Sequence, residues 1–159
     1  MVIESLLGPL RAPGTPPVHQ IGVVVASRDD AVDRYSAMFG YREWRRDTFG
    51  PDDVERMTLR GADARYSMRL AFAGEAPELE LIEPAGGASL YSEWLAERGE
   101  GLHHLAVIVS SLDESIAALE QAGFANVQAG HGFKPGGTGG YAYFDTTATL
   151  GLILECVEI

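Results

Sequence analysis

The sequence has little cysteine and no long hydrophobic run. Cys156 is the only cysteine among the 159 residues, so no disulfide can form within the chain, and we expect a reducing compartment, the cytoplasm. No apolar run reaches the length of about eighteen residues that a membrane-spanning helix needs. The first 17 residues carry an acid at Glu4 and no basic residue before their short apolar stretch, which is the wrong pattern for a secretory signal. We therefore expect no membrane partner.

Basic residues are also scarce. There are 12 lysines and arginines against 23 aspartates and glutamates, which gives a formal net charge of −11 at pH 7. A field of this sign repels nucleic-acid phosphates and anionic lipid surfaces. The composition therefore predicts small-molecule partners and no nucleic acid. Apolar residues make up 46% of the chain, enough for the core of a single domain.

We expect the chain to divide into an N-terminal arm, residues 1–17, and a single domain, residues 18–159. Pro13, Pro16 and Pro17 prevent the end of the arm from being regular helix. The arm could pack against a neighbouring segment or be loose.

The domain contains an internal repeat. A shift of 84 residues lays 19–38 on 103–122, with identities at His19/His103, Val23/Val107, Val25/Val109, Ser27/Ser111 and Asp29/Asp113. A shift of 75 residues lays "LELIE" (79–83) on "LECVE" (154–158), so that Glu80 matches Glu155. We predict two modules, 18–84 and 102–159, joined by an amphipathic helix near 88–99.

Each module begins with a β-branched run typical of a strand, followed by a helical pattern. Ser27 and Ser111 are expected to cap the two helices, and Gly40 and Gly123 to end them. Further strands are predicted at 55–60, 66–73 and 78–84 in the first module, and at 126–129, 141–146 and 150–158 in the second.

Polar residues stand out on these strands. Side chains alternate across a strand, so His104 is expected on one face with Ala106, and His103 on the other. By the repeat, Gln20 corresponds to His104. Gly22 and Ala106 are small, which predicts open volume for a substrate beside these residues. Glu80 and Glu155 interrupt apolar strands and need partners if they are buried.

The stretches "HQIGVVV", "ELELIEP", "GEGLHHLAV" and "GLILECVE" resemble the vicinal oxygen chelate superfamily, which includes glyoxalase I, methylmalonyl-CoA epimerase, extradiol dioxygenases and antibiotic-resistance proteins. The resemblance covers nearly all of 18–159. It implies an α+β fold in which two tandem βαβββ modules form an open, cup-shaped β-sheet around a metal.

The resemblance also implies a ligand set. The metal positions of the family fall on Gln20, Glu80, His104 and Glu155, and a one-residue slip of the first strand would replace Gln20 by His19. These donors suit one divalent ion, and zinc, nickel, cobalt, manganese and iron are all compatible with them.

The implied activity is that of a metal-dependent isomerase or lyase acting on a small carbonyl substrate. Glu155 and Glu80 are the candidate catalytic residues, because a carboxylate beside the ion can move a proton on the carbon next to the carbonyl. Arg65 and Arg69, in a predicted strand, and Lys134, in the glycine-rich loop 131–141, are candidates for substrate binding. The alternative for these cations is a structural role beside local acids or in solvent.

Two other functions stay open at this stage. An extradiol-type dioxygenase would hold iron with two histidines and one carboxylate. A drug-binding protein of the same fold would use the cleft without a metal. Open sheet edges and the apolar residues Leu6, Leu7 and Leu10 of the arm predict a homodimer. Glu83 and Glu158, at strand ends, are expected to be solvated.

Overall fold

The computed structural model describes residues 5–159, so the first four residues of the predicted arm, Glu4 included, lie outside the described residues. The first half contains β1 (Gln20–Val24), α1 (Arg28–Phe39), β2 (Arg45–Phe49), β3 (Arg56–Leu59), β4 (Ala62–Asp63), β5 (Ser67–Ala73) and β6 (Glu78–Gly86). After α2 (Leu90–Arg98), the second half contains β7 (Gly101–Ile108), α3 (Leu112–Gln121), β8 (Asn126–His131), β9 (Gly140–Phe144), α4 (Thr147–Leu150) and β10 (Ile153–Glu158).

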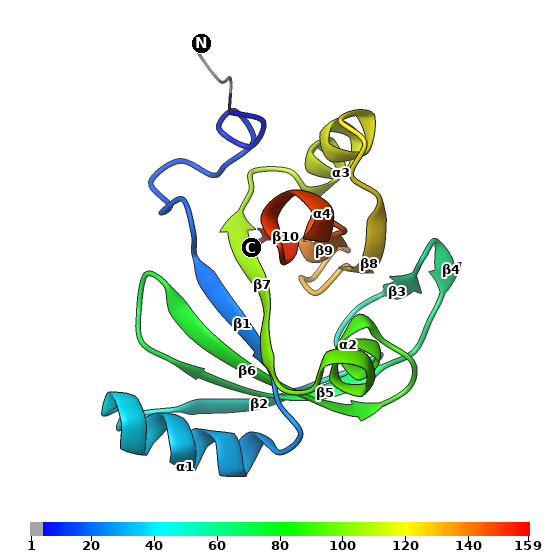
Figure 1. The fold of residues 1–159 in the computed structure, drawn as a ribbon. Coiled ribbons are helices and arrows are strands. Elements are labelled where there is room, and N and C mark those ends of the chain that lie inside the picture. Colours follow the sequence, from blue (N-terminus) through cyan, green and yellow to red (C-terminus); the bar gives the residue numbers. More distant parts are fainter. Residues whose placement is uncertain (1–4) are drawn as a thin grey trace.

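The strands of residues 5–159 form one curled sheet of ten strands in the order β2-β5-β6-β1-β7-β10-β9-β8-β3-β4 (Figure 1). Helix α1 packs on β5 and β6, and α3 packs on β8, β9 and β10. The predicted fold class, an α+β chain with an open, cup-shaped sheet, is confirmed.

The duplication is visible in the strand pairing at the centre of the sheet. β1 runs antiparallel to β7, with Gln20 opposite Ala106 and Gly22 opposite His104. β1 is parallel to β6, and β7 is parallel to β10. This crosswise register makes Gln20 the equivalent of His104, as the sequence repeat predicts.

The last strand of each module is also tied to the first helix of that module. Glu83 accepts a hydrogen bond from the backbone N–H of Arg28 at 2.7 Å, and Glu158 accepts one from that of Leu112, also at 2.7 Å. Arg28 and Leu112 are the first residues of α1 and α3. The expectation that these two glutamates are solvated was wrong, because the unpaired N–H groups of a helix start attract a carboxylate.

The strands of the first half do not all pair with one another. β3 pairs with β8 of the second module, and β2 forms an edge of the sheet beside β5. β2 reads "RRDTF" and is exposed over most of its length. It lacks the apolar alternation of a half-buried strand, which is why the sequence does not predict it.

The described part of the arm lies against its own chain. Arg11 forms an isolated bridge with Val109, and the N–H of Ala12 donates to the carbonyl of Ile108 at 2.9 Å. Leu7 packs against the apolar cluster beneath α3. The homodimer stays a prediction. Nowhere in residues 5–159 is there a helix with the length and apolar character needed to cross a membrane.

Candidate metal centre

Three side chains from three strands meet inside the curl of the sheet. They are Glu80 on β6, His104 on β7 and Glu155 on β10, and their donor atoms all lie within 4.8 Å of one another. The Nε2 atom of His104 is 3.3 Å from Oε2 of Glu80 and 3.1 Å from Oε2 of Glu155. All three residues are buried. The structure therefore brings together three of the four ligands that the family resemblance implies.

These three donor atoms lie close together and have no partner outside the cluster. Oε2 of Glu80, Nε2 of His104 and Oε2 of Glu155 are buried, and none has a hydrogen-bond partner. Ligand bonds of about 2.0–2.2 Å to one ion would hold donor atoms roughly 3.0–3.5 Å apart, and the distances of 3.3 Å and 3.1 Å from Nε2 of His104 to the two carboxylates fall in this range. The two carboxylates and the imidazole thus fit a divalent cation.

The protonation of the cluster follows from its burial and its charges. Burial raises the pKa of Glu80, and the nearby His104 only partly offsets this. Burial tends to lower the pKa of His104, but the carboxylates of Glu155 and Glu80 outweigh it and raise the pKa to about 9. Without an ion, the imidazole therefore carries the positive charge of the site at neutral pH.

The ring of His104 lies where a side chain of residue 22 would be. A Cβ atom built on Gly22 would fall within contact of Cε1, Nε2 and Nδ1 of His104 at impossibly short distances. The expectation that Gly22 leaves open volume for a substrate was therefore wrong. The space of the absent side chain is occupied by a candidate ligand from the neighbouring strand.

Gln20 borders the same cavity as Glu80 and Glu155. Its Nε2 atom donates to Oε1 of Glu78 at 2.7 Å, and Glu78 lies 3.8 Å from Arg45 at the rim. His19, the alternative to Gln20, precedes β1 and contributes no donor atom to the cluster. Its backbone N–H donates to the carbonyl of Ala106, which places it in the sheet without bringing its ring to the site.

His103 lies on the same side of β7 as His104. The pairing of β1 with β7 shifts register between Gly22 and Val23, which are opposite His104 and Leu102, so His103 is the extra residue of a β-bulge. Its Nδ1 atom is 3.0 Å from Nδ1 of His104. The prediction that His103 and His104 lie on opposite faces of the strand, which assumed strict alternation, was therefore wrong. The adjacent pair His103–His104 is the one sequence feature that could have indicated this bulge.

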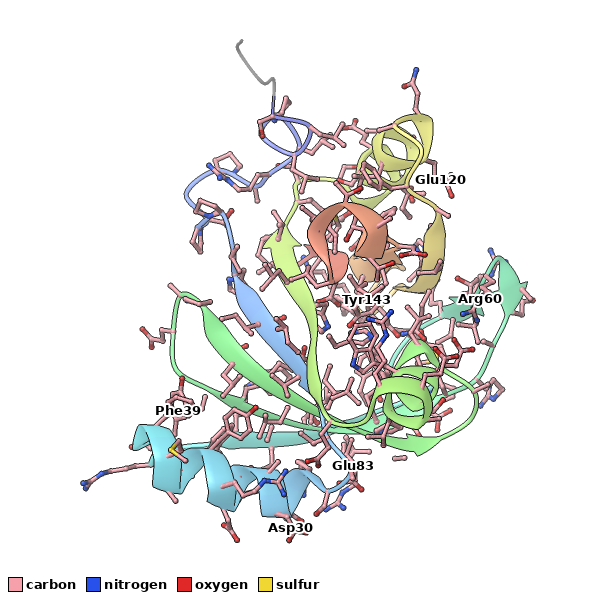
Figure 2. The ribbon with its side chains drawn as sticks, viewed as in Figure 1. Asp30, Phe39, Arg60, Glu83, Glu120 and Tyr143 are labelled. Carbon is pink, nitrogen blue, oxygen red and sulfur yellow. The ribbon has the colours of Figure 1, made fainter. Side chains whose placement is uncertain are left out.

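The cavity beside the cluster has a volume of about 280 Å³. Its lining is mainly apolar and aromatic, with Gln20, Arg45, Asp47, Glu80 and Glu155 as its polar members; the others are Phe49, Met68, Leu70, Phe72, Tyr91, Phe133, Tyr141, Tyr143, Val157 and Ile159. Tyr143 lies inside the curl of the sheet (Figure 2), and its hydroxyl accepts a hydrogen bond from that of Tyr91 at 2.8 Å. Burial raises the pKa of Tyr143 well above its usual value, so it is neutral.

The predicted substrate-binding cations do not line this cavity. Arg65 precedes β5, its side chain is 76% exposed, and its guanidinium is 3.9 Å from Asp52. Lys134 is exposed, and its neighbour in the loop, Phe133, is the residue that reaches the cavity.

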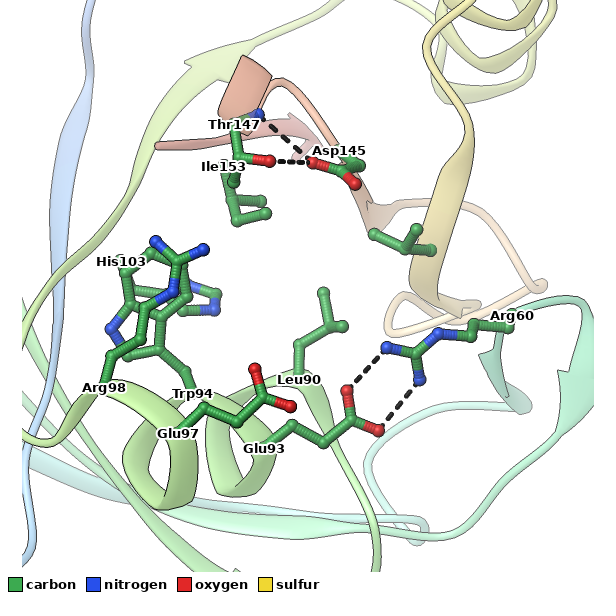
Figure 3. A pocket seen from close by; sticks show the side chains of 11 residues that line it. Arg60, Leu90, Glu93, Trp94, Glu97, Arg98, His103, Asp145, Thr147 and Ile153 are labelled. Carbon is green, nitrogen blue, oxygen red and sulfur yellow. Dashed lines mark hydrogen bonds and ion pairs between the residues drawn. The ribbon is translucent and has the colours of Figure 1, made fainter. Parts of the chain in front are cut away.

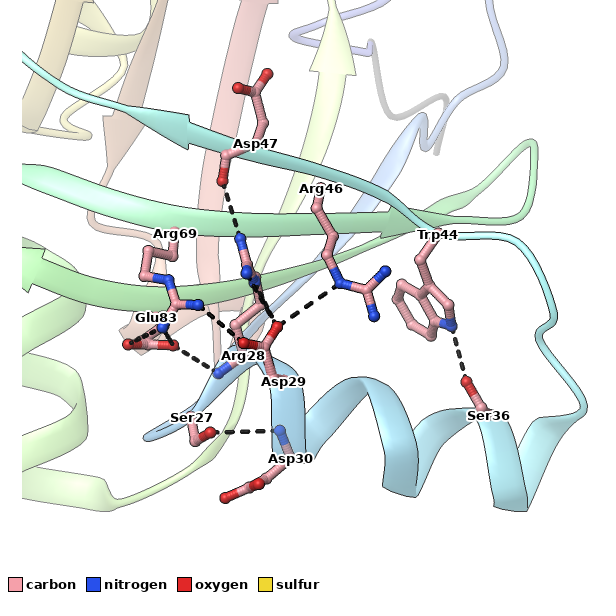
Figure 4. A network of polar contacts seen from close by, with 10 residues as sticks. All are labelled: Ser27, Arg28, Asp29, Asp30, Ser36, Trp44, Arg46, Asp47, Arg69 and Glu83. Carbon is pink, nitrogen blue, oxygen red and sulfur yellow. Dashed lines mark hydrogen bonds and ion pairs between the residues drawn. The ribbon is translucent and has the colours of Figure 1, made fainter.

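Arg69 faces the outside of the sheet. Its neighbours on β5, Met68 and Leu70, line the cavity, so alternation turns Arg69 away from it. There its guanidinium donates to Asp29 at 2.8 Å and to Glu83 at 3.2 Å, in a network at the start of α1 (Figure 4). Arg69 thus offsets local acids.

A second cavity, of about 200 Å³, borders His103 near α2 (Figure 3). Arg60 forms a two-pronged ion pair with Glu93 in this cavity, and the guanidinium of Arg98 lies 4.2 Å from the centre of the Trp94 ring. Its other charged residues are Glu97, Arg98 and Asp145, and no residue that lines it belongs to the cluster of Glu80, His104 and Glu155.

Residues 19–144 match the family described as the Glyoxalase/Bleomycin resistance protein/Dioxygenase superfamily. The chain belongs to this family, the vicinal oxygen chelate superfamily. The resemblance that the sequence motifs carry is thereby confirmed.

Similar proteins come from several bacteria. The uncharacterized protein YqjC of Bacillus subtilis (strain 168) is 29% identical over 140 residues, which cover 87% of this chain and 89% of YqjC. Methylmalonyl-CoA epimerase from Mycobacterium tuberculosis has 22% identity over 99% of this chain and 92% of its own, with a TM-score of 0.64. Methylmalonyl-CoA epimerase from Streptomyces coelicolor, in complex with 2-nitronate-propionyl-CoA, has 22% identity over 91% and 95%, with a TM-score of 0.60. At these identities the solved structures show a shared fold.

Proposed function

We propose that this member of the vicinal oxygen chelate superfamily is a metal-dependent isomerase or lyase that moves a proton on the carbon beside a substrate carbonyl. The observation that carries the proposal is the convergence of Glu80, His104 and Glu155, three buried donors that have no hydrogen-bond partner. Buried carboxylates in this state are costly unless a cation accompanies them.

The proposed ligands are His104 through Nε2, Glu80 and Glu155 through their Oε2 atoms, and Gln20. The hydrogen bond from Nε2 of Gln20 to Glu78 commits the nitrogen end of the amide, which leaves the oxygen for the ion. A divalent ion held there would act as a Lewis acid and stabilise the negative charge that develops on the carbonyl oxygen of the substrate.

The proton transfer is assigned to a carboxylate. Of the two carboxylates, Glu155 and Glu80, the one that would leave the ion when the substrate binds takes the proton from the carbon beside the carbonyl and returns it to the same or a neighbouring carbon. The Oε2 atoms of both are buried, so water competes little for the proton. Glu155 is the first candidate, and Glu80 is the second.

The cavity supports a small reacting group with apolar surroundings. Its volume of about 280 Å³ and its aromatic lining suit the acyl or aldehyde part of a substrate. Arg45, 61% exposed at the rim, is the cation available to an anionic group that extends outward. Arg69, held by acids on the outer face, is not part of the proposed site.

The structure favours proton transfer over the extradiol-type oxygenase. That chemistry uses two histidines and one carboxylate around iron, whereas the cluster offers one imidazole and two carboxylates. The second histidine, His103, directs Nδ1 to His104 and contributes no atom to the cluster. In a drug-binding protein without a metal, the two buried carboxylates would have a single imidazolium, that of His104, as their cationic partner.

The first test is metal content and proton exchange. We expect purified protein dialysed against Co²⁺ to retain one equivalent of the ion. It should then exchange the proton on the carbon beside the carbonyl of methylmalonyl-CoA, or of the glutathione–methylglyoxal adduct, with D₂O, as followed by NMR. These two probes represent the epimerase and glyoxalase types of reaction.

Variants separate the roles of the two acids. Glu155→Gln should abolish exchange, by at least about a hundredfold, while it keeps most of the Co²⁺. Glu75→Gln, in the turn outside the cavity between β5 and β6, is the matched control. Retention of full activity by Glu155→Gln would refute the assignment of the base. Failure to bind any divalent ion would favour the metal-free binding protein.

A further inference from the structure

The ring of His103 is enclosed by aromatic side chains. Its residue is fully buried, and its ring centre lies 4.9 Å from that of Trp94, 5.5 Å from Tyr91 and 5.8 Å from Tyr143. Trp94 and Tyr91 belong to α2, and Tyr143 to β9. Because packing from two elements leaves few rotamers open to it, His103 presents Nδ1 to its neighbour in a fixed direction.

The short distance between the two imidazoles requires a proton between them. Nδ1 of His103 and Nδ1 of His104 are 3.0 Å apart, so one of them donates a hydrogen bond and the other accepts it. Nε2 of His104 faces the two carboxylates. A histidine that offers the Nε2 lone pair to an ion keeps its proton on Nδ1. His104 is therefore the donor, and His103 is the acceptor.

We infer that His103 is a positioning residue, which accepts the Nδ1 proton of His104 and so fixes the tautomer and ring orientation of that ligand. The inference rests on the proposed metal site. Ligating histidines usually donate to a carboxylate, a backbone carbonyl or water. A neutral imidazole in this place adds no negative charge behind His104, so the positive charge of an ion at Nε2 is offset less than it would be with a carboxylate partner.

The β-bulge in β7 is what makes this contact possible. In a regular strand, adjacent side chains point to opposite faces. The register shift opposite Gly22 turns both rings to one side, and the missing side chain of Gly22 gives the His104 ring its place. The geometry thus couples a backbone irregularity to the orientation of a candidate ligand.

NMR on the metal-free protein tests the hydrogen bond directly. With ¹⁵N-labelled histidine, we expect a nitrogen–nitrogen coupling through the hydrogen bond between the two Nδ1 atoms, and a proton bound to Nδ1 of His104. After addition of Zn²⁺, the proton should stay on Nδ1 of His104 while its Nε2 signal shifts. Absence of the coupling, or Zn²⁺ bound through Nδ1 of His104, would overturn the inference.

A pair of variants tests the effect on the ion. His103→Leu removes the acceptor, and we expect its Co²⁺ affinity to fall by about 10- to 100-fold. His103→Asn can place an amide oxygen near the position of Nδ1 and should restore most of that affinity. His131→Leu, at the end of β8, is the matched control and should bind Co²⁺ like the wild type.

The outcomes separate this inference from the proposed function. Equal losses in His103→Leu and His103→Asn would show that packing, and not the hydrogen bond, matters, and would overturn the inference. Wild-type affinity in His103→Leu would do the same. If the wild-type protein binds no Co²⁺, the proposed function fails, and the coupling in the metal-free protein still decides how the two imidazoles are joined. If His103→Leu does not fold, the coupling and the His103→Asn variant carry the test.

Discussion

The imidazole of His104 occupies the space that a side chain on Gly22 would need, across the pair of central strands β1 and β7. The two residues are directly opposite in the register, and the glycine is what allows the ring to lie between Glu80 and Glu155. Gly22, which has no side chain to take part in the chemistry, is thus required for the geometry of the candidate site.

Gly22→Ala should therefore disrupt the cluster. The methyl group would collide with the His104 ring on a buried strand, so we expect Co²⁺ affinity to fall at least about a hundredfold and the free energy of unfolding to fall by about 1–3 kcal/mol. Titration of the visible absorption of Co²⁺ and urea denaturation measure the two effects. Gly50→Ala, whose Cβ would meet Ser67 Cβ at 3.3 Å, is the control. Wild-type binding by Gly22→Ala would contradict this placement of the ring.

The hydrogen bond between Gln20 and Glu78 leads to a second prediction. Glu78→Ala removes the acceptor that holds Nε2 of Gln20 at 2.7 Å. Because the amide could then turn either end toward the ion, we expect Co²⁺ affinity to fall by about tenfold. Glu78→Gln keeps an acceptor oxygen and should lose less. If Glu78→Ala binds Co²⁺ as well as the wild type does, Gln20 is not a ligand held in this way.

The stability of the metal-free protein should decrease as pH rises. The folded-state pKa of His104, about 9, lies above its ordinary value of 6.5, so the folded protein binds more protons than the unfolded chain between these values. The stabilisation is complete below pH 6.5 and is lost as pH rises through about 9. Its upper bound is on the order of 3 kcal/mol. The pKa of Glu80 is also raised above its ordinary value of 4.5, so this group too stabilises the folded protein when protonated, and its contribution begins to be lost at a lower pH than that of His104.

Urea denaturation in the presence of a chelator, at intervals from pH 6 to pH 9.5, measures this dependence. His104→Gln should remove most of the slope above pH 6.5, because it removes the titrating group. The groups that face His104 are Glu80, Glu155, His103 and Tyr143. An equally steep slope in His104→Gln would show that the pH dependence has another origin.

The carboxylate of Glu158, which lies at the start of α3, should contribute to the stability of the fold and not to Co²⁺ binding. Glu158→Ala removes the acceptor for the N–H of Leu112, and we expect a loss of about 1–2 kcal/mol in the free energy of unfolding. Glu158→Gln keeps an oxygen at the same place and should lose about half as much. Co²⁺ affinity should be unchanged in both. A large change in affinity would mean that β10 moves with this contact.

The candidate ligands could be predicted from the sequence because they depend on local and repeated patterns. Repeated strands place corresponding residues at corresponding positions. The correspondence of Gln20 with His104, and of Glu80 with Glu155, therefore follows from two sequence offsets. The family resemblance then supplied the fold, which the family match and the curled sheet confirm.

Side chains alternate between the two faces only in regular strands. The tertiary structure decided where this alternation is broken and which face of each strand meets the cavity. The bulge at His103 depends on how β7 pairs with β1, and no residue of β7 alone dictates it. The outward direction of Arg69 follows from which face of β5 meets the cavity, since Met68 and Leu70 take that face.

The sequence by itself determined the acidic composition of the chain and its internal repeat, because composition and strand periodicity are encoded locally, and through its family resemblance it pointed to the residues of the candidate centre. Only the tertiary structure decided that β3 closes onto β8, that the space above Gly22 holds an imidazole, and that His103 stands behind His104. These features depend on contacts between strands far apart in the chain, and their geometry is set when the two halves pack together.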